Sequence, residues 1–185
     1  ARANELAEMW QTWAARANVL PVDPQAEPKL KKNKKKFKLS HGDDLNRENA
    51  PYVEKRGFIV LANIEMDGNN GVIMAQGGTS AGWSLYLKEG KLTFSIRRGG
   101  KMHSVTSPKP LSNTTGTVSM SLEINGRVRL GFNSDTIADG QTGLVDVMPL
   151  DGLQVGSDLL GAVGNYKAPF ALEGKVTQGH VIFAD

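Results

Sequence analysis

The sequence predicts an all-β fold, an antiparallel β-sandwich of the jelly-roll type preceded by one N-terminal helix. Two observations predict it. From residue 37 onward the chain divides into many short apolar or alternating runs, with glycine-rich turns between them. Residues 117–133 also contain two alternating runs around Asn125-Gly126, the pattern of a β-hairpin. An isolated hairpin is only marginally stable, so its apolar face requires a second layer.

The register of this hairpin follows from its hydrophobic pattern. A two-residue loop at Asn125-Gly126 would pair Leu122 with Arg129 and place arginines on the apolar face. A three-residue loop, with Gly126 left-handed as a bulge, pairs Leu122 with Val128 and keeps that face apolar. We therefore predict the second register. The residues expected to face the interior are Val118, Met120, Leu122, Val128, Leu130, Phe132, Trp83 and Phe94.

Residues 1–20 are expected to form a helix that runs from Asn4 to Asn18 and cannot continue past Pro21. One apolar stripe at helical spacing comprises Leu6, Met9, Trp10, Trp13 and Ala17. An apolar stripe of this kind is rarely left exposed on a soluble monomer. We expect it to dock on the chain's own sandwich, the alternative within this chain being a second copy.

Residues 21–36 hold three prolines and most of a lysine run, which predicts a linker. The lysines Lys31, Lys32, Lys34, Lys35 and Lys36 have two interpretations. They form a solvated tether, or they contact polyanions such as sulfated glycans. No aromatic residue is interleaved with them before Phe37, and no reader motif is present, so we expect no nucleic-acid partner.

The sandwich is expected to span residues 37–185. Besides the central hairpin, strand-like runs cover 37–39, 57–66, 72–76, 83–88, 92–97, 102–106, 143–147, 150–156 and 174–183, with Ile137 in a further short strand. Residues 108–110 contain two prolines and predict a loop.

The composition excludes several classes of function. The chain has 185 residues, a net charge of +3 and no cysteine, so disulfides, thiolate metal sites and cysteine nucleophiles are excluded. Subtracting the seven lysines between Lys29 and Lys38 leaves −4, so the basic character is local. No apolar run approaches membrane-spanning length, and the residues at the start of this sequence do not have the pattern of a signal-peptide core.

Two groups of residues carry a resemblance to a known family. Residues 73–78 (IMAQGG), 82–91 (GWSLYLKEGK) and 153–158 (LQVGSD), followed by Tyr166, Phe170 and Gly174-Lys175-Val176, resemble the C-terminal concanavalin A-like, laminin G-like domain of bacterial arylsulfatases. Residues 10–21 (WQTWAARANVLP) resemble the segment that closes the sulfatase catalytic domain. The two similarities occur in the family's order and cover most of the chain.

The resemblance implies a non-catalytic accessory domain of a sulfatase, a sulfuric ester hydrolase. Family members use a formylglycine, made from Cys or Ser in Cys/Ser-x-Pro-x-Arg, beside a calcium ion. This chain lacks that motif, since Ser107-Pro108-Lys109-Pro110 has the wrong spacing and Asp43-Asp44 lacks the family's His and Lys partners. We therefore expect no sulfatase activity from this chain alone. The resemblance implies that it binds or orients a sulfated polysaccharide, or braces the catalytic domain, in the periplasm or outside the cell.

Two other functions are alternatives to a sulfatase accessory domain. A free-standing lectin-like carbohydrate-binding module fits the same strands, although it has no reason to carry a double-tryptophan helix upstream of a linker. A glycoside hydrolase on this fold needs paired carboxylates on one strand, as in Glu-x-Asp-x-x-Glu, and no such pattern occurs.

The candidate site for a sugar or anion combines an aromatic platform with cations. Tyr86 lies on the opposite strand face from Trp83 and is expected to be available for stacking on a sugar ring. Around one turn, Arg97, Arg98, Lys101 and His103 are expected to hold a sulfate or carboxylate. The alternative is an ordinary solvated hairpin tip.

Calcium is the metal we consider, because laminin G-like folds often carry one at the sandwich rim. Hard oxygen donors are available in Asp158, Asp67, Asn69 and Asn70. The alternative is that Asp158 and Asn69 stabilise turns through their own backbone. The histidines His41, His103 and His180 show no metal-ligand spacing.

Overall fold

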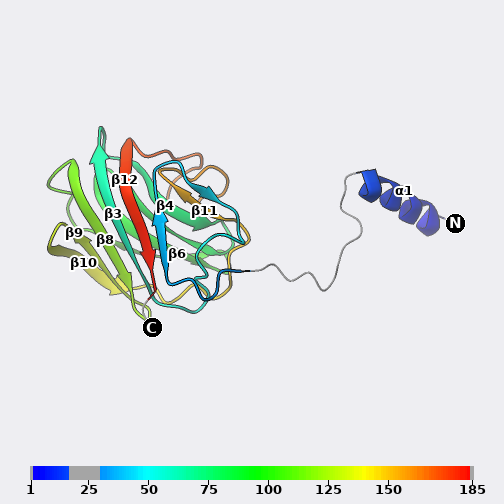
Figure 1. Cartoon of the computed structure of the whole chain (residues 1–185), viewed down its shortest axis with the longest axis horizontal. Helices are drawn as coiled ribbons and strands as arrows, with labels where there is room; N and C mark the ends of the chain where they lie inside the picture. Colours follow the sequence, from blue (N-terminus) through cyan, green and yellow to red (C-terminus); the bar gives the residue numbers. More distant parts are fainter. Residues whose placement is uncertain (1, 17–29, 184–185) are drawn as a thin grey trace.

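The computed structural model describes residues 2–16 and 30–183 of the chain. It contains one helix, α1 (Arg2–Arg16), and two six-stranded sheets (Figure 1). The strands are β1 (Lys36–Leu39), β2 (Asp44–Leu45), β3 (Phe58–Met66), β4 (Gly71–Gly77), β5 (Gly82–Lys88), β6 (Lys91–Arg98), β7 (Lys101–Thr106), β8 (Thr115–Leu122), β9 (Arg127–Phe132), β10 (Asp135–Gln141), β11 (Leu153–Val155) and β12 (Gly174–Ile182). No helix in the described ranges is long and apolar enough to cross a membrane.

The two sheets form the predicted antiparallel sandwich. The first sheet has the strand order β1-β12-β3-β8-β9-β10, and the second has the order β2-β11-β4-β5-β6-β7. All paired strands within them are antiparallel. Strand β12 lies between β1 and β3, so segments far apart in sequence are neighbours in the first sheet.

The β8–β9 hairpin has the register that its hydrophobic pattern predicts. Leu122 pairs with Val128 and Val118 with Phe132 across a three-residue loop. Gly126 adopts a φ of +83°, the left-handed conformation that this bulged loop requires. A two-residue loop would have turned the arginines of β9 inward.

The core lies between the sheets, and every residue predicted to face the interior is buried there. The Phe58 ring contacts Trp83, with centroids 5.1 Å apart, and Phe94, with centroids 6.3 Å apart. Trp83 donates its indole N–H to Gln76 Oε1 over 3.1 Å, and Gln76 Nε2 donates to the Pro51 carbonyl over 2.9 Å. These bonds satisfy the indole N–H of Trp83 and the side-chain amide of Gln76 inside the core.

The strands differ from the sequence-based prediction at three places, the first being the short strand β2, which was not predicted. Residues 135–141 form the edge strand β10, where the sequence indicated only Ile137, and residues 143–147 form no strand. Strand β10 has the sequence DTIADGQ, whose Asp and Gly residues have low β-propensity. It pairs with β9 because the turn at 133–134 directs it back along that strand.

The lysine run also differs from the expected linker. Residues 21–29 lie outside the described part of the chain, but from Leu30 onward the segment contacts the sandwich. Lys31 forms a β-bridge with Pro51, and the Lys35 carbonyl accepts a hydrogen bond from Phe183 N over 2.8 Å. Strand β1 then begins at Lys36, one residue before the predicted start at Phe37.

Helix α1 begins at Arg2, two residues before the predicted start. Leu6, Met9, Trp10 and Trp13 are each more than half exposed. Docking of this stripe on the chain's own sandwich, which we expected from the sequence, is therefore not found. Ala17, the last residue of the predicted stripe, lies outside the described residues.

Candidate functional site

Tyr86 lies on the outer face of the second sheet, as its strand alternation predicts, but it is only 2% exposed. The connection from β11 to β12, residues 156–173, covers it; we call this segment the cover loop. The Tyr166 ring meets Tyr86 edge-on, with centroids 4.9 Å apart, and Phe170 stacks on Tyr166 at 4.9 Å. Gly164 passes so close that a Cβ there would lie 2.5 Å from the Tyr86 ring. The expectation that Tyr86 stacks on a sugar ring is therefore wrong.

Asp158 helps to fix the cover loop in place. It is buried, and its Oδ2 accepts a hydrogen bond from Tyr166 Oη over 2.6 Å and one from Val163 N over 3.4 Å. Burial raises the pKa of the Asp158 carboxyl, an effect that the hydrogen bond from Tyr166 opposes. Burial and the bond to Asp158 also raise the pKa of Tyr166. The carboxylate thus holds the cover loop through Tyr166 and Val163.

The predicted calcium ligands do not come together. Asp158 lines a small cavity of about 110 Å³, whereas Asn69 lines a different one beside the Pro110–Thr114 loop. In the β3–β4 turn, which includes Asp67, the N–H groups of Asn69 and Asn70 donate to Glu173 Oε2 over 2.8 and 3.0 Å. Within residues 2–16 and 30–183, no group of three or more His, Cys, Asp or Glu side chains is placed to hold a metal ion. Calcium binding stays a prediction.

Strand alternation places Arg97 on one face of the second sheet and Arg98, Lys101 and His103 on the other. Arg97 faces outward, where its Nε donates to the Val163 carbonyl of the cover loop over 2.8 Å and its Nη1 to the Gly100 carbonyl over 2.9 Å. Arg98 lies on the opposite face of β6, with its Nη2 3.2 Å from His103 Nε2. Lys101 is exposed at the strand end opposite Arg98. The four side chains thus do not converge on one point, and anion binding at this turn stays a prediction.

Residues 31–38, which we call the lysine segment, form a second cluster of positive charge on the surface. Its lysines are exposed, yet two of their ammonium groups lie against aromatic rings. Lys32 Nζ is 5.4 Å from the Tyr52 ring centroid, and Lys34 Nζ is 4.3 Å from that of Phe37. The segment is bound to the sandwich through Arg56, whose Nη1 donates to the Lys32 carbonyl over 3.0 Å.

Arg56 adds a further cation beside the segment. Its guanidinium carbon is 4.0 Å from the Phe183 ring centroid. Among the ion pairs of the described residues, none joins Lys31, Lys32, Lys34 or Arg56 to a carboxylate. Sequence reasoning identified these lysines but missed Arg56, which lies far from them in the chain.

The outer face of the first sheet was not considered as a site from the sequence, although its polar positions are visible in the alternation of β8. Ile59, Leu61 and Ile182 lie on it partly exposed, and Ser119 and Ser121 lie beside them on β8. A shallow cavity of about 170 Å³ on this face is lined in part by Ile59, Ser119, Ser121 and Arg129.

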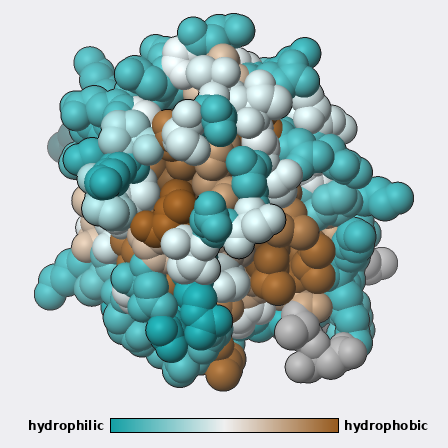
Figure 2. Space-filling view, turned by 90° about the vertical axis from the view of Figure 1, so that its left-hand side faces the viewer, coloured by the Kyte–Doolittle hydropathy of each residue, from teal (hydrophilic) through white to brown (hydrophobic). Residues whose placement is uncertain are grey.

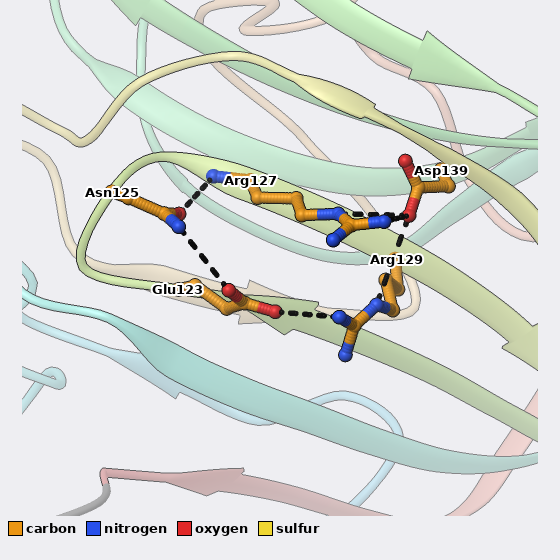
Figure 3. Close-up of polar contacts among 5 residues, drawn as sticks. All are labelled: Glu123, Asn125, Arg127, Arg129 and Asp139. Atoms are coloured by element: carbon orange, nitrogen blue, oxygen red, sulfur yellow. Dashed lines mark hydrogen bonds and ion pairs between the residues drawn. The ribbon is translucent and has the colours of Figure 1, made fainter.

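A polar network closes this face at its β9–β10 end (Figure 3). Arg127 Nε donates to Asp139 Oδ2 over 2.9 Å, and Arg129 Nη2 is 3.2 Å from Glu123 Oε1. Asn125 Oδ1 accepts a hydrogen bond from Arg127 N over 2.9 Å and so connects the hairpin loop to the network. The two arginines are balanced by two carboxylates, so this end of the face carries little net charge.

The side of the molecule that carries β9 and β10 shows apolar surface between polar side chains (Figure 2). A cavity of about 270 Å³ lies between the β7–β8 connection and the β9–β10 turn. Its lining includes Pro108, Pro110, Leu111, Phe132 and Ile137, with Lys109 and Asp135 as its charged residues. One cation beside one carboxylate gives this cavity no preference for an anion.

Comparisons with known proteins place the fold. No family model matches the chain, and no curated protein matches it either. The CBM40 domain of the Ruminococcus gnavus IT-sialidase, bound to alpha2,3 sialyllactose, has 20% identity and a TM-score of 0.56, covering 82% of this chain and 92% of that one. Domains LG4-5 of the mouse laminin alpha1 chain have 12% identity and a TM-score of 0.56, covering 83% of this chain and 41% of that one. Botulinum neurotoxin type C, described as interacting with two ganglioside molecules, has 12% identity and a TM-score of 0.51, covering 81% and 40%.

These likenesses and the two antiparallel sheets define a β-sandwich of the laminin G-like jelly-roll class, which confirms the predicted fold. Within that class, the CBM40 domain is matched over nearly its whole length. None of the three structures is a sulfatase, so the sulfatase parent that the sequence resemblance implies stays a prediction.

Proposed function

We propose that this chain is a non-catalytic carbohydrate-binding module that takes anionic glycans, sulfated or carboxylated, at the lysine segment. The observation that carries the proposal is that Lys32, Lys34 and Arg56 lie against aromatic rings while the backbone between Lys31 and Lys36 is bonded to the sandwich. Ring contacts of this kind restrict where an ammonium or guanidinium group can lie, and so reduce the entropy that binding must remove. A solvated tether needs none of these contacts.

The chemistry of the segment favours a polyanion. Lysine ammonium groups and Arg56 offer charge-assisted hydrogen bonds to sulfate or carboxylate oxygens. Exposed contacts of this type weaken as added salt screens them. The CBM40 domain bound to sialyllactose and the neurotoxin described with gangliosides support a saccharide, because both share this fold.

We further propose that this module is part of a larger sulfatase. The sequence resemblance supports an accessory domain that presents a sulfated polysaccharide to a sulfatase catalytic domain, in the periplasm or outside the cell. The exposed stripe of α1, with Trp10 and Trp13, supports an additional partner, because apolar surface of this size is rarely left uncovered. A free-standing lectin-like module is the second candidate, and the extent of the CBM40 match favours it.

Affinity chromatography on dextran sulfate tests the proposal, with unsulfated dextran as the reference matrix. Substituting Lys31, Lys32 and Lys34 with Ser should lower the salt concentration that elutes the protein, with little retention left at low salt. Substituting Lys91, Lys109 and Lys167 with Ser removes the same charge elsewhere and should leave elution nearly unchanged. Equal shifts for the two triple variants would mean that net charge alone causes retention, and the proposed site would be refuted.

A further inference from the structure

The outer face of the first sheet continues directly from the lysine segment. Across this sheet, Lys36, Ile182, Ile59, Ser121 and Arg129 are successive partners on β1, β12, β3, β8 and β9. The neighbouring row contains, in the same strand order, Lys38, His180, Leu61, Ser119 and Gly131. Their sequence neighbours, such as Phe37, Val60 and Met120, face the core, so both rows point outward.

We propose that a glycan chain lies along these two rows, across the strands, with an acidic group at Lys36 and Lys38 and neutral sugar rings over Ile59, Leu61 and Ile182. The inference rests on the proposed function, since it assigns the path of the same ligand. Strands lie about 4.8 Å apart, so the four intervals from β1 to β9 span about 19 Å. A face of that length accommodates an oligosaccharide rather than a single sugar.

The chemistry along the rows changes in the order that such a ligand needs. At the β1 edge there are ammonium groups, and next to them His180, whose pKa is lowered by partial burial and by the charges of Lys36 and Lys38. In the middle, Ile59 is 37% exposed, and Leu61 and Ile182 are half-buried. Aliphatic side chains of this kind offer apolar contact to the C–H face of a sugar ring, with polar neighbours to fix its hydroxyls.

Beyond the apolar centre the rows become neutral and polar. Ser119 and Ser121 supply hydroxyl groups that both donate and accept hydrogen bonds. Arg129 is held by Glu123 at 3.2 Å and Asp139 at 3.7 Å, so its charge is offset (Figure 3). A second acidic group is therefore not favoured here, and the ligand is acidic at one end and neutral along the rest.

The second sheet provides no comparable face. The cover loop lies over Tyr86, Val72 and Ala75, which are buried beneath Tyr166 and Phe170. The cover loop is also bonded to the sheet at both ends of β5–β6, through Arg97 to Val163 and through Lys88 to Asn165. Of the two outer faces, the first sheet's is the one that leaves its central strands accessible.

A titration monitored by backbone amide NMR tests this path. The probes are a dextran oligosaccharide sulfated at one end only, the unsulfated oligosaccharide and sodium sulfate. With the sulfated oligosaccharide, amide shifts should extend from β1 through β12 and β3 to Ser119–Ser121. Sodium sulfate should move only the lysine segment. The matched pair is Ile59→Glu and Met102→Glu, because Met102 is 38% exposed on the outer face of the second sheet. Ile59→Glu should weaken binding at least about tenfold, because a neutral ring over this position would lose its apolar contact and would strip water from the new carboxylate, and Met102→Glu should not weaken it.

Ser121→Gln provides a second variant that fills the rows without adding charge, and it should also weaken binding. Thermal unfolding of each variant confirms that it is folded before its affinity is compared. If shifts stop at β1, or if Ile59→Glu and Met102→Glu bind equally, the path is refuted while the lysine site stands. If the protein with its native lysines binds none of the sulfated probes, the proposed function fails as well.

Discussion

The outer faces of the two sheets differ although their strands alternate in the same way. On the second sheet, Tyr86 lies beneath Tyr166 and Phe170 of the cover loop and is inaccessible to solvent. On the first sheet, Ile59, Leu61 and Ile182 occupy equivalent outward positions and stay partly exposed. The difference arises from a distant connection, residues 156–173, and not from the strands themselves. An outward residue is thus a candidate ligand contact only where no other segment packs over it.

The largest expected effect is the loss of stability when an outward-facing side chain is removed from the covered face of the second sheet rather than from the open face of the first sheet. Tyr86→Ala removes a buried aromatic ring, and substitutions of this kind lower the free energy of unfolding by about 3–5 kcal/mol. Ile59→Ala, the matched change on the open face, should cost well under half as much because much of the side chain is already in water. Denaturant unfolding of both variants measures the difference. Similar losses at the two positions would contradict the assignment of one closed and one open face.

A smaller loss of stability is expected when the hydrogen bond between Tyr166 and Asp158 is removed from the cover loop. Tyr166→Phe keeps the ring that stacks on Phe170 but removes the hydroxyl that donates to Asp158 over 2.6 Å. Hydrogen bonds to charged groups contribute about 1.5–3 kcal/mol, so we expect a loss of that order in the free energy of unfolding. A double-mutant cycle with Asp158→Asn should show strong coupling between the two positions. Additive losses would mean that the hydroxyl and the carboxylate act independently.

The pH dependence of stability should report the burial of Asp158. Because burial raises the pKa of Asp158 above the ordinary carboxyl value of 3.8, the folded state holds this proton more tightly than the unfolded state does. The contribution of Asp158 to the free energy of unfolding therefore falls as the pH rises from 3.8 through the raised pKa.

Comparison with Asp158→Asn isolates this contribution, since the variant cannot titrate at the position. Relative to Asp158→Asn, the native chain should be most stable in acid and should lose that advantage toward neutral pH. Urea unfolding of both proteins across the acidic range provides the measurement. A difference between them that does not vary with pH, or that changes in the opposite direction, would show that the carboxyl is not desolvated in the folded protein.

The smallest effect lies at the edge of the open face. Lys34→Gln removes the ammonium that lies 4.3 Å from the Phe37 ring centroid, and exposed contacts of this type are worth about 0.5–1 kcal/mol. Lys38→Gln removes the same charge from β1, where the described part of the chain shows no ring contact for this ammonium group. The first variant should be slightly less stable than the second by thermal unfolding. Indistinguishable variants would argue that the lysine segment is placed by its backbone bonds alone.

Local patterns in the sequence were enough to predict the strands and pairing of the sandwich, but not the packing of the cover loop on it. The alternation around Asn125-Gly126 predicted the pairing of Leu122 with Val128, because register depends on which face must be apolar. The same reasoning placed Tyr86 opposite Trp83, which is correct. Its burial depends on contacts with residues 80 positions away, which no periodicity indicates.

The candidate site was predictable only in part for the same reason. The lysines stand out in the sequence, but their ring partner Tyr52 and the neighbouring Arg56 are brought to them by the fold. Arg97 and Arg98 are adjacent in sequence and face opposite sides of β6, so their proximity along the chain was misleading. The rows on the first sheet join five strands, and that order is set by the topology.

The position of β12 has a consequence for how the first sheet forms. Strand β1 is an edge strand whose partner in the sheet is β12, and β12 in turn pairs with β3. Residues 36–39 therefore stay unpaired until residues 174–182 are in place. Contacts between such distant segments form slowly, because the intervening chain must first be closed into a loop. We therefore expect β1 to be among the last parts of the sandwich to assemble, so the proposed binding face would be complete only when folding is almost finished.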